Sequence, residues 1–123
     1  MAAEPTILVV DDDNEIRDSL RDVLQDAGYA VVTSADGAEA LAYLRAHAAP
    51  ALILLDWMMP RCDGSQFRAA QRSHPVLARI PVVLLTADAR VEEKRRALAV
   101  DEALEKPVSL DRLLDVVARF CGG

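Results

Sequence analysis

The stretch TILVVDDD, residues 6–13, decides the fold class, because five uncharged residues run directly into three aspartates. A strand that is covered on both faces lacks polar alternation, so this stretch predicts a buried strand of a parallel sheet. The segments ALILL (51–55) and PVVLL (81–85) repeat the pattern, whereas YAVVT (29–33) is more polar at its ends and EALE (102–105) is weaker. The sequence therefore predicts five strands, the last of them at an edge.

Segments with helical periodicity lie between these strands. Ile16, Leu20, Val23 and Leu24 form one apolar stripe, and Gly28 is expected to cap its carboxyl end. A second helix is expected to open with the capping box of Asp36 and Glu39, and a third is expected over residues 64–72. A fourth is expected over residues 89–98, with Asp88 as its cap. The last is expected to have Ser109 as its cap and to bury Leu110, Leu113, Leu114 and Val117. Strand and helix alternate five times, which predicts an α/β fold: a doubly wound, parallel, five-stranded sheet with helices on both faces.

The composition fits one globular domain, and we expect residues 1–123 to form it. The net charge of −6 disfavours binding to nucleic acid and to an anionic membrane surface. The amino-terminal residues do not resemble a signal peptide, and the apolar runs are too short to span a bilayer. Cys62 and Cys121 make no disulfide framework, so we expect a cytoplasmic protein.

Polar residues follow four of the predicted strands: Asp11 and Asp12 follow the first, Asp56 the third, Thr86 the fourth and Lys106 the fifth. Sites in such sheets lie beyond the carboxyl ends of the strands. If the first and third strands are neighbours, two carboxylates at ~4 Å repel by about 4 kcal/mol at an effective dielectric of ~20. A divalent cation such as Mg²⁺ offsets that repulsion better than protonation, and a lysine ammonium suits a phosphate oxygen. The alternative for the acidic run is a polar strand exit in which Asp13 or Asn14 caps the next helix.

Four stretches carry a family resemblance: ILVVDDD (7–13), LILLDWMMPRCDG (52–64), PVVLLTADA (81–89) and LEKPVSLDRLL (104–114). In order and spacing they resemble the receiver domain of two-component response regulators, a flavodoxin/CheY-like fold with strand order 2-1-3-4-5. The resemblance implies a phosphorylatable switch that accepts a phosphoryl group from a histidine kinase or histidine phosphotransfer protein and acts on a downstream protein. Such a module is not a conventional enzyme, although it assists its own phosphorylation and dephosphorylation.

The resemblance also assigns roles in the chemistry. Asp56 would be the phosphoacceptor, a carboxylate nucleophile that forms an acyl phosphate. Asp12 would bind Mg²⁺, or Mn²⁺ in its place, directly, and Asp11 would bind it through water. Asp56 and the backbone carbonyl of Met58 would complete the protein ligands. Lys106 would pair with a phosphoryl oxygen.

The switching residues include one departure from the family pattern. Thr86 would be the switch hydroxyl, and Pro107 would follow a cis peptide bond that aims the preceding lysine inward. Three residues before that lysine the family usually has Tyr or Phe, whereas this chain has Ala103. Asp88, two residues after Thr86, would either orient the hydrolytic water or cap the next helix, and capping is the preferred interpretation. Because Ala103 replaces the aromatic residue, any switching is expected through the fourth helix and its loop, or through a different residue.

Alternative functions stay open at this point. A degenerate receiver would act only by binding proteins, and Ala103 keeps that hypothesis alive. A Mg²⁺-dependent phosphohydrolase with an aspartyl nucleophile would use Asp11 and Asp13, but the chain lacks the rest of that motif and any insertion long enough for a cap domain. A flavodoxin-like carrier is disfavoured because carboxylates stand where a flavin phosphate would bind. We expect a monomer or a weak dimer.

Overall fold

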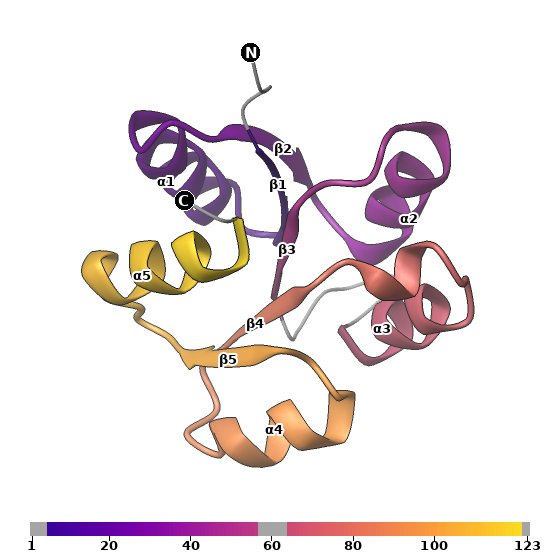
Figure 1. Ribbon diagram of the computed structural model, residues 1–123. Helices are drawn as coiled ribbons and strands as arrows, with labels where there is room; N and C mark the ends of the chain where they lie inside the picture. The colour runs from indigo at the N-terminus through magenta and orange to yellow at the C-terminus, as the bar shows by residue number, and fades with distance from the viewer. Residues whose placement is uncertain (1–4, 57–63, 122–123) are drawn as a thin grey trace.

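The computed structural model describes residues 5–56 and 64–121, which form alternating strands and helices (Figure 1). The elements are β1 (Thr6–Val10), α1 (Asn14–Asp26), β2 (Ala30–Ser34), α2 (Gly37–Ala46), β3 (Leu52–Asp56), α3 (Gly64–Arg72), the short 3₁₀ helix η1 (Leu77–Arg79), β4 (Val82–Thr86), α4 (Val91–Leu98), β5 (Glu102–Glu105) and α5 (Leu110–Cys121). Each predicted strand is present within one residue of its expected bounds.

The five strands form one parallel sheet in the order β2-β1-β3-β4-β5, which confirms the predicted fold class. The order reverses direction between β1 and β3, where Val10 lies opposite Leu55 in the register. The carboxyl ends of these two neighbouring strands therefore meet at one edge of the sheet. Such a reversal point is where parallel α/β sheets place their ligands.

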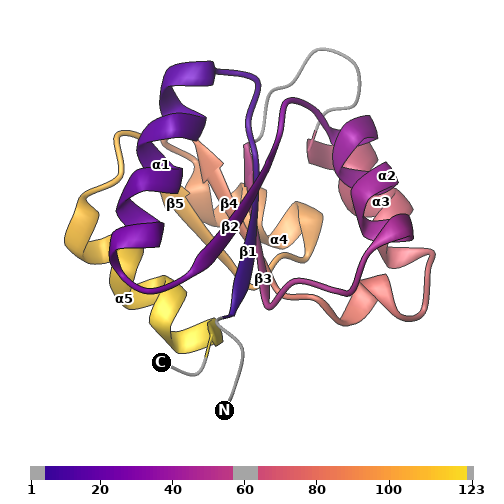
Figure 2. The same ribbon diagram turned by 90° about the horizontal axis from the view of Figure 1, so that it is seen from above.

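The sheet separates two hydrophobic cores. Helices α1 and α5 cover one face, and α2, α3 and α4 cover the other (Figures 1 and 2). Successive residues of a strand point to opposite faces, so Leu8 packs in the core beneath α2 and α3, while Val9 packs in the core beneath α1 and α5. This two-sided burial explains why the three central strands β1, β3 and β4 are apolar over most of their length, whereas the edge strands β2 and β5 are more polar.

Three polar side chains begin helices as the sequence predicts. The Asp13 carboxylate accepts hydrogen bonds from the backbone N–H groups of Glu15 and Ile16, at 2.9 and 3.2 Å. Asp36 caps α2 in the same way, and the Ser109 hydroxyl accepts from the first turn of α5. Gly28, with φ of 100°, follows the end of α1 in the left-handed region that suits glycine.

The amino-terminal end of α4 differs from the prediction. The helix begins at Val91 after Arg90, whose side chain makes no capping hydrogen bond, so the expected cap by Asp88 is wrong. The Asp88 carboxylate instead accepts from the N–H of Arg90 at 2.8 Å and closes a turn ahead of the helix.

The buried stripe predicted for α5 needs one correction. Leu110, in the first turn of the helix, is 50% exposed, whereas Leu113 and Val117 are buried and Leu114 is partly buried. Within residues 5–56 and 64–121, no helix is both long enough and apolar enough to cross a lipid bilayer.

Candidate functional site

The carboxyl ends of β1 and β3 bring three aspartates together. Asp56 is the last residue of β3, and Asp11 directly follows β1 and donates its backbone N–H to the carbonyl of Ser34 at 3.1 Å. One carboxylate oxygen from each of Asp11, Asp12 and Asp56 lies within 4.8 Å of the others. The side chains of Asp11 and Asp56 are buried, and that of Asp12 is exposed. The cluster therefore offers a cation two carboxylates from the protein interior and one from the surface.

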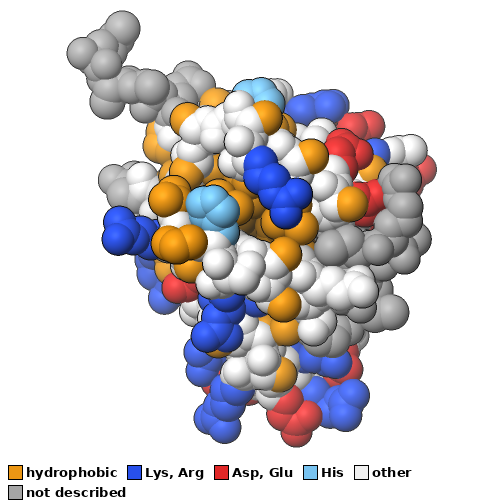
Figure 3. Space-filling view, turned by 90° about the vertical axis from the view of Figure 1, so that its right-hand side faces the viewer, with side chains coloured by type: hydrophobic (Ala, Val, Ile, Leu, Met, Phe, Trp, Pro, Cys, Tyr) orange, Lys and Arg blue, Asp and Glu red, His pale blue; other side chains and the backbone are white. Residues whose placement is uncertain are grey.

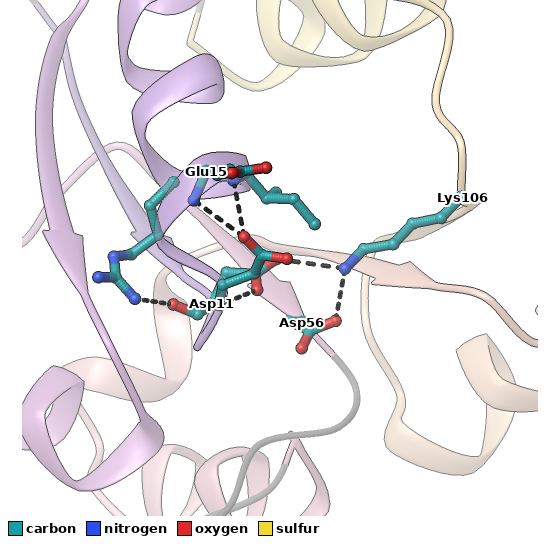
Figure 4. A network of polar contacts seen from close by, with 7 residues as sticks. Asp11, Glu15, Asp56 and Lys106 are labelled. Atoms are coloured by element: carbon teal, nitrogen blue, oxygen red, sulfur yellow. Dashed lines mark hydrogen bonds and ion pairs between the residues drawn. The ribbon is translucent and has the colours of Figure 1, made fainter.

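Lys106 brings a positive charge into this cluster from the end of β5. Its Nζ lies 2.8 Å from Oδ1 of Asp56 and 3.2 Å from Oδ2 of Asp11. Figure 4 shows the ammonium group reaching between the two carboxylates. The ammonium group neutralises part of the negative charge that the strand ends concentrate at this edge.

The pKa values of Asp56 and Lys106 are perturbed by their surroundings. Burial raises the pKa of Asp56, and the negative charges of Asp11 and Asp12 add to the increase, which outweighs the opposing effect of Lys106. Burial alone would lower the pKa of Lys106, but its hydrogen bond to Asp56 and the charges of Asp56 and Asp11 raise it. The lysine is therefore held in its charged form, while the Asp56 carboxylate is less stable as an anion than an exposed aspartate.

Local hydrogen bonds fix Asp11 in place. Its Oδ1 accepts from the N–H of Asp13 at 3.0 Å, and its carbonyl accepts from Nη1 of Arg17 at 2.7 Å. Arg17 also bonds the side chain of Asn14 in the first turn of α1. Arg17 lies outside the apolar stripe of Ile16, Leu20, Val23 and Leu24, so its contact with the Asp11 carbonyl follows only from the fold.

The donor set suits a hard divalent cation. Carboxylate oxygens are the ligands that Mg²⁺ and Mn²⁺ prefer, and a cation at this point would relieve the mutual repulsion of the three aspartates. Met58, whose backbone carbonyl was expected to contribute, lies outside the described residues.

Thr86 ends β4 on the next strand and is buried. Its Oγ1 accepts from the N–H of Asp88 at 3.1 Å, and its carbonyl accepts from the N–H of Lys106 at 2.7 Å. The hydroxyl therefore holds the start of the loop between β4 and α4. The carboxylate of Asp88 is engaged by Nη2 of Arg90 at 3.0 Å and by Nζ of Lys94 at 3.7 Å.

The remaining switch positions lie on β5 and just after it. The peptide bond between Lys106 and Pro107 is cis. Ala103 is buried in the core beneath α4, opposite Leu84 of β4. A small methyl group thus occupies the position where the resemblance leads us to expect an aromatic ring.

An open hollow of about 620 Å³ lies next to Lys106, between α1 and the start of α5. Its lining is mostly apolar and includes Ile16 and Leu20 of α1, Pro107 and Val108. The periodicity of α1 indicates that Ile16 and Leu20 face inward, but only the fold shows that they border an open surface beside the acidic cluster.

Comparison with known proteins identifies the family. The profile described as "Response regulator receiver domain" matches residues 7–118. This chain belongs to that family. The receiver is 42% identical over 110 residues to the response regulator MprA of Mycobacterium sp. (strain KMS), and the match covers 88% of this chain and 46% of MprA. It therefore spans about half the length of that curated relative.

Solved structures agree with this assignment. Chemotaxis protein CheY4 of Vibrio cholerae superposes on the receiver with a TM-score of 0.87 and 36% identity, covering 96% of this chain and 99% of that one. Response regulator TrrA of Thermotoga maritima, solved in complex with Mg²⁺ and BeF, gives a TM-score of 0.83 and 31% identity, covering 94% and 98%. The receiver is thus a two-component signalling module of a family that binds Mg²⁺ in an acidic pocket and interacts with histidine kinases and downstream targets.

Proposed function

We propose that Asp56 is the phosphoacceptor of this receiver and takes a phosphoryl group from a histidine kinase or a histidine phosphotransfer protein. The observation that carries the proposal is the pairing of a buried aspartate at the end of β3 with the Lys106 ammonium at 2.8 Å, inside a cluster of three carboxylates. The proposed setting is the cytoplasm, where both cysteines stay reduced, with the receiver a monomer or a weak dimer.

The proposed transfer is a substitution at phosphorus. A carboxylate oxygen of Asp56 attacks the phosphorus atom, the bond between phosphorus and the donor imidazole nitrogen breaks, and that nitrogen keeps the electron pair. The Lys106 ammonium, which binds the carboxylate before transfer, then has a phosphoryl oxygen within reach. The raised pKa of Lys106 keeps it positively charged throughout the physiological range.

The divalent ion of the reaction would be held by Asp11, Asp12 and Asp56, with the carbonyl of Met58 as the further ligand that the resemblance implies. When bound, Mg²⁺ supplies positive charge to the oxygens of the phosphoryl group. Asp11 is already oriented by the N–H of Asp13 and by the salt bridge to Lys106, so little rearrangement is needed on that side.

Thr86 is the proposed switch. In the unmodified receiver its Oγ1 accepts a hydrogen bond from the N–H of Asp88. A phosphoryl group on Asp56 offers the hydroxyl a charged acceptor, and rotation toward it would release the start of the β4–α4 loop. Because Ala103 has no ring to follow the threonine, the proposed output is a change in this loop and in α4.

Donor docking is proposed at the hollow beside Lys106. Its apolar lining from α1 and from residues 106–108 lies next to the acceptor, so a helix of the donor that packs there would bring its histidine to Asp56.

The test is intact mass spectrometry after incubation with Mg²⁺ and acetyl phosphate, from which acetate is the leaving group. We expect one base-labile phosphoryl adduct on the wild-type receiver. Asp56→Asn and a metal-free sample should show none, and Asp111→Asn, a change on the exposed first turn of α5, should be modified like the wild type. A folded wild-type receiver that binds Mg²⁺ without modification would instead support the degenerate receiver that Ala103 suggests.

A further inference from the structure

A second hollow lies on the face covered by α2 and α3 and has a volume of about 440 Å³. It lies between the end of α2, with the loop that follows, and the turn between α3 and β4. Its lining residues are Leu44, Arg45, His47, Ala49, His74, Val76 and Leu77. Figure 3 shows both histidines of the chain beside a hydrophobic floor that a basic side chain borders.

This hollow is separate from the acidic cluster. The loops that form it precede β3 and β4, so they lie at the amino ends of these strands. Asp56 and Thr86 terminate the same two strands at the opposite edge of the sheet. A ligand in the hollow would therefore not contact the proposed phosphoryl site.

The segments that form the hollow carry positive charge, whereas the whole chain has a net negative charge. The receiver has a net charge of −6, yet residues 40–55 and 64–87 contain no aspartate or glutamate. The basic and histidine side chains of these two segments are Arg45, His47, Arg68, Arg72, His74 and Arg79. The hollow itself is lined by three of them and by no acidic residue. A negatively charged partner would meet complementary charge here and repulsion over much of the remaining surface.

Both histidine rings are held by local contacts. Nδ1 of His74 accepts the N–H of Leu77 at 3.4 Å, which leaves Nε2 to donate. The ring of His47 stacks on Tyr43 with centroids 4.4 Å apart, and its Nδ1 lies 3.1 Å from the Tyr43 carbonyl. Rings that are already oriented lose less conformational freedom when they bind a partner.

The floor of the hollow is hydrophobic. Leu44 and Leu77 are buried at its base, and Val76 is 59% exposed beside it. An exposed branched side chain next to an apolar depression provides contacts for one large aliphatic side chain of a partner. Nucleic acid fits poorly, because the hollow offers few cations and no aromatic face other than the histidines.

We propose that this hollow binds an acidic segment of a partner protein, which places one aliphatic side chain on Leu44, Val76 and Leu77. Carboxylates on either side of that side chain would pair with Arg45, His47 and His74. The surface would recruit its partner independently of phosphorylation, because it lies at the other end of the strands.

The test is an NMR titration of the receiver (residues 1–123), labelled with ¹⁵N, with the peptide acetyl-Glu-Glu-Leu-Glu-Glu-amide. We expect the amide signals of residues 44–49 and 74–79 to shift, and those of residues 11–13 and 86–88 to stay in place. Mg²⁺ added to a second sample should shift the latter set instead. A peptide with lysine in place of each glutamate, or with glycine in place of leucine, should bind at least threefold more weakly.

Matched variants decide whether the hollow is the binding site. Arg45→Gln combined with His74→Gln should lower the affinity about three- to tenfold, the range for the loss of one exposed ion pair and one hydrogen bond. Arg112→Gln removes an exposed arginine from α5 and should leave the affinity unchanged. Circular dichroism would confirm that each variant is folded.

Three results would overturn the proposal. One is no response to the acidic peptide at millimolar concentration, and another is an equal response to all three peptides. The third is equal binding of free 4-methylpentanoate, which would assign the hollow to small carboxylates rather than to a protein segment.

Discussion

Ala99, the residue that ends α4, adopts a left-handed backbone conformation with φ of 53°. This conformation costs a residue with a Cβ atom ~1–2 kcal/mol, whereas glycine adopts it without that cost. We predict that Ala99→Gly raises the free energy of unfolding by about 0.5–1 kcal/mol, because the relief exceeds the entropy that glycine adds to the unfolded chain. Urea denaturation measures the change.

Ala42→Gly is the matched control for that substitution. Ala42 is exposed in the middle of α2, where glycine should lower the free energy of unfolding by ~1 kcal/mol. A loss of stability in both variants would contradict the interpretation of Ala99.

Asp88 offers a second prediction for a single residue. Hydrogen bonds from the side chain and the backbone of Arg90 lower its pKa to about 2. We predict that Arg90→Gln raises the pKa of Asp88 toward 3.8, measured by ¹³C NMR of the carboxyl group during a pH titration. Because the folded-state pKa is depressed, the stabilisation from Asp88 is present above the unfolded value of 3.8 and is lost as the pH falls through about 2.

A control variant shows whether the pKa of Asp88 depends on its bonds to Arg90 or on the overall charge of the protein. Arg96→Gln changes an exposed arginine that pairs with Glu92 and should leave the titration of Asp88 where it is in the wild type. An Asp88 that titrates near 3.8 in the wild type would show that Arg90 does not hold it in solution.

At the scale of elements, α3 fastens the end of α4 through a buried arginine. Nε and Nη2 of Arg68 donate to the carbonyls of Leu98 and Ala99 at 3.0 and 2.5 Å. Nη1 of Arg68 donates to Gln71, whose amide donates to the carbonyls of Leu77 and Ile80. Two side chains of α3 thus satisfy the carbonyl groups of two separate segments.

We predict that Arg68→Met lowers the free energy of unfolding by about 2–3 kcal/mol, because it leaves buried carbonyl groups without a donor. Amide hydrogen exchange should accelerate in residues 95–100 more than in α1. Arg72→Met, an exposed substitution in the same helix, should change the free energy of unfolding by no more than ~0.5 kcal/mol. It should also leave the hydrogen exchange of residues 95–100 unchanged. Unchanged exchange in α4 after Arg68→Met would contradict the fastening role.

Helix patterns predicted these elements unevenly, for identifiable reasons. The apolar stripe of α1 follows from periodicity, and Asp13, Asp36 and Ser109 act as the caps that their positions predict. The predicted start of α4 was wrong because an aspartate can close a turn ahead of a helix as readily as it caps one. The bonds of Arg68 to Leu98 and Ala99 were not predictable, since partners 30 and 31 residues away are brought together only by the fold. Gln71 bonds the carbonyls of Leu77 and Ile80, 6 and 9 residues further along, and no helical or strand pattern in the sequence indicates those contacts.

At the scale of the whole molecule, the acidic edge of the sheet predicts a response to divalent ions. We predict that Mg²⁺ raises the midpoint of thermal unfolding by several degrees, because an ion at 100 times its dissociation constant adds about 2.7 kcal/mol to stability. Differential scanning fluorimetry with and without Mg²⁺ measures the effect. Asp12→Asn should reduce the increase, and Asp115→Asn, on the exposed side of α5, should not. An equal increase in both variants would place the ion elsewhere.

The location of the acidic cluster could be predicted from the sequence better than its internal arrangement. Asp11, Asp56 and Lys106 follow buried strands, and parallel strands end at a common edge, so their proximity follows from the order of the strands. Which carboxylate the ammonium contacts depends on side-chain positions across three strands, and no local pattern contains that information. The second hollow was missed for a similar reason: His47 and His74 stand in loops that only the packing of α2 beside α3 brings together.

The sheet lies between two separate hydrophobic cores, and this arrangement has a consequence for the proposed switch. The residues of β4 and β5 that face α4 belong to one core, and those that face α1 and α5 belong to the other. The movement proposed for the β4–α4 loop would therefore loosen the core beneath α2, α3 and α4 while the core beneath α1 and α5 keeps its packing. In that proposal the sheet would act as a partition between a half that reorganises and a half that preserves the fold.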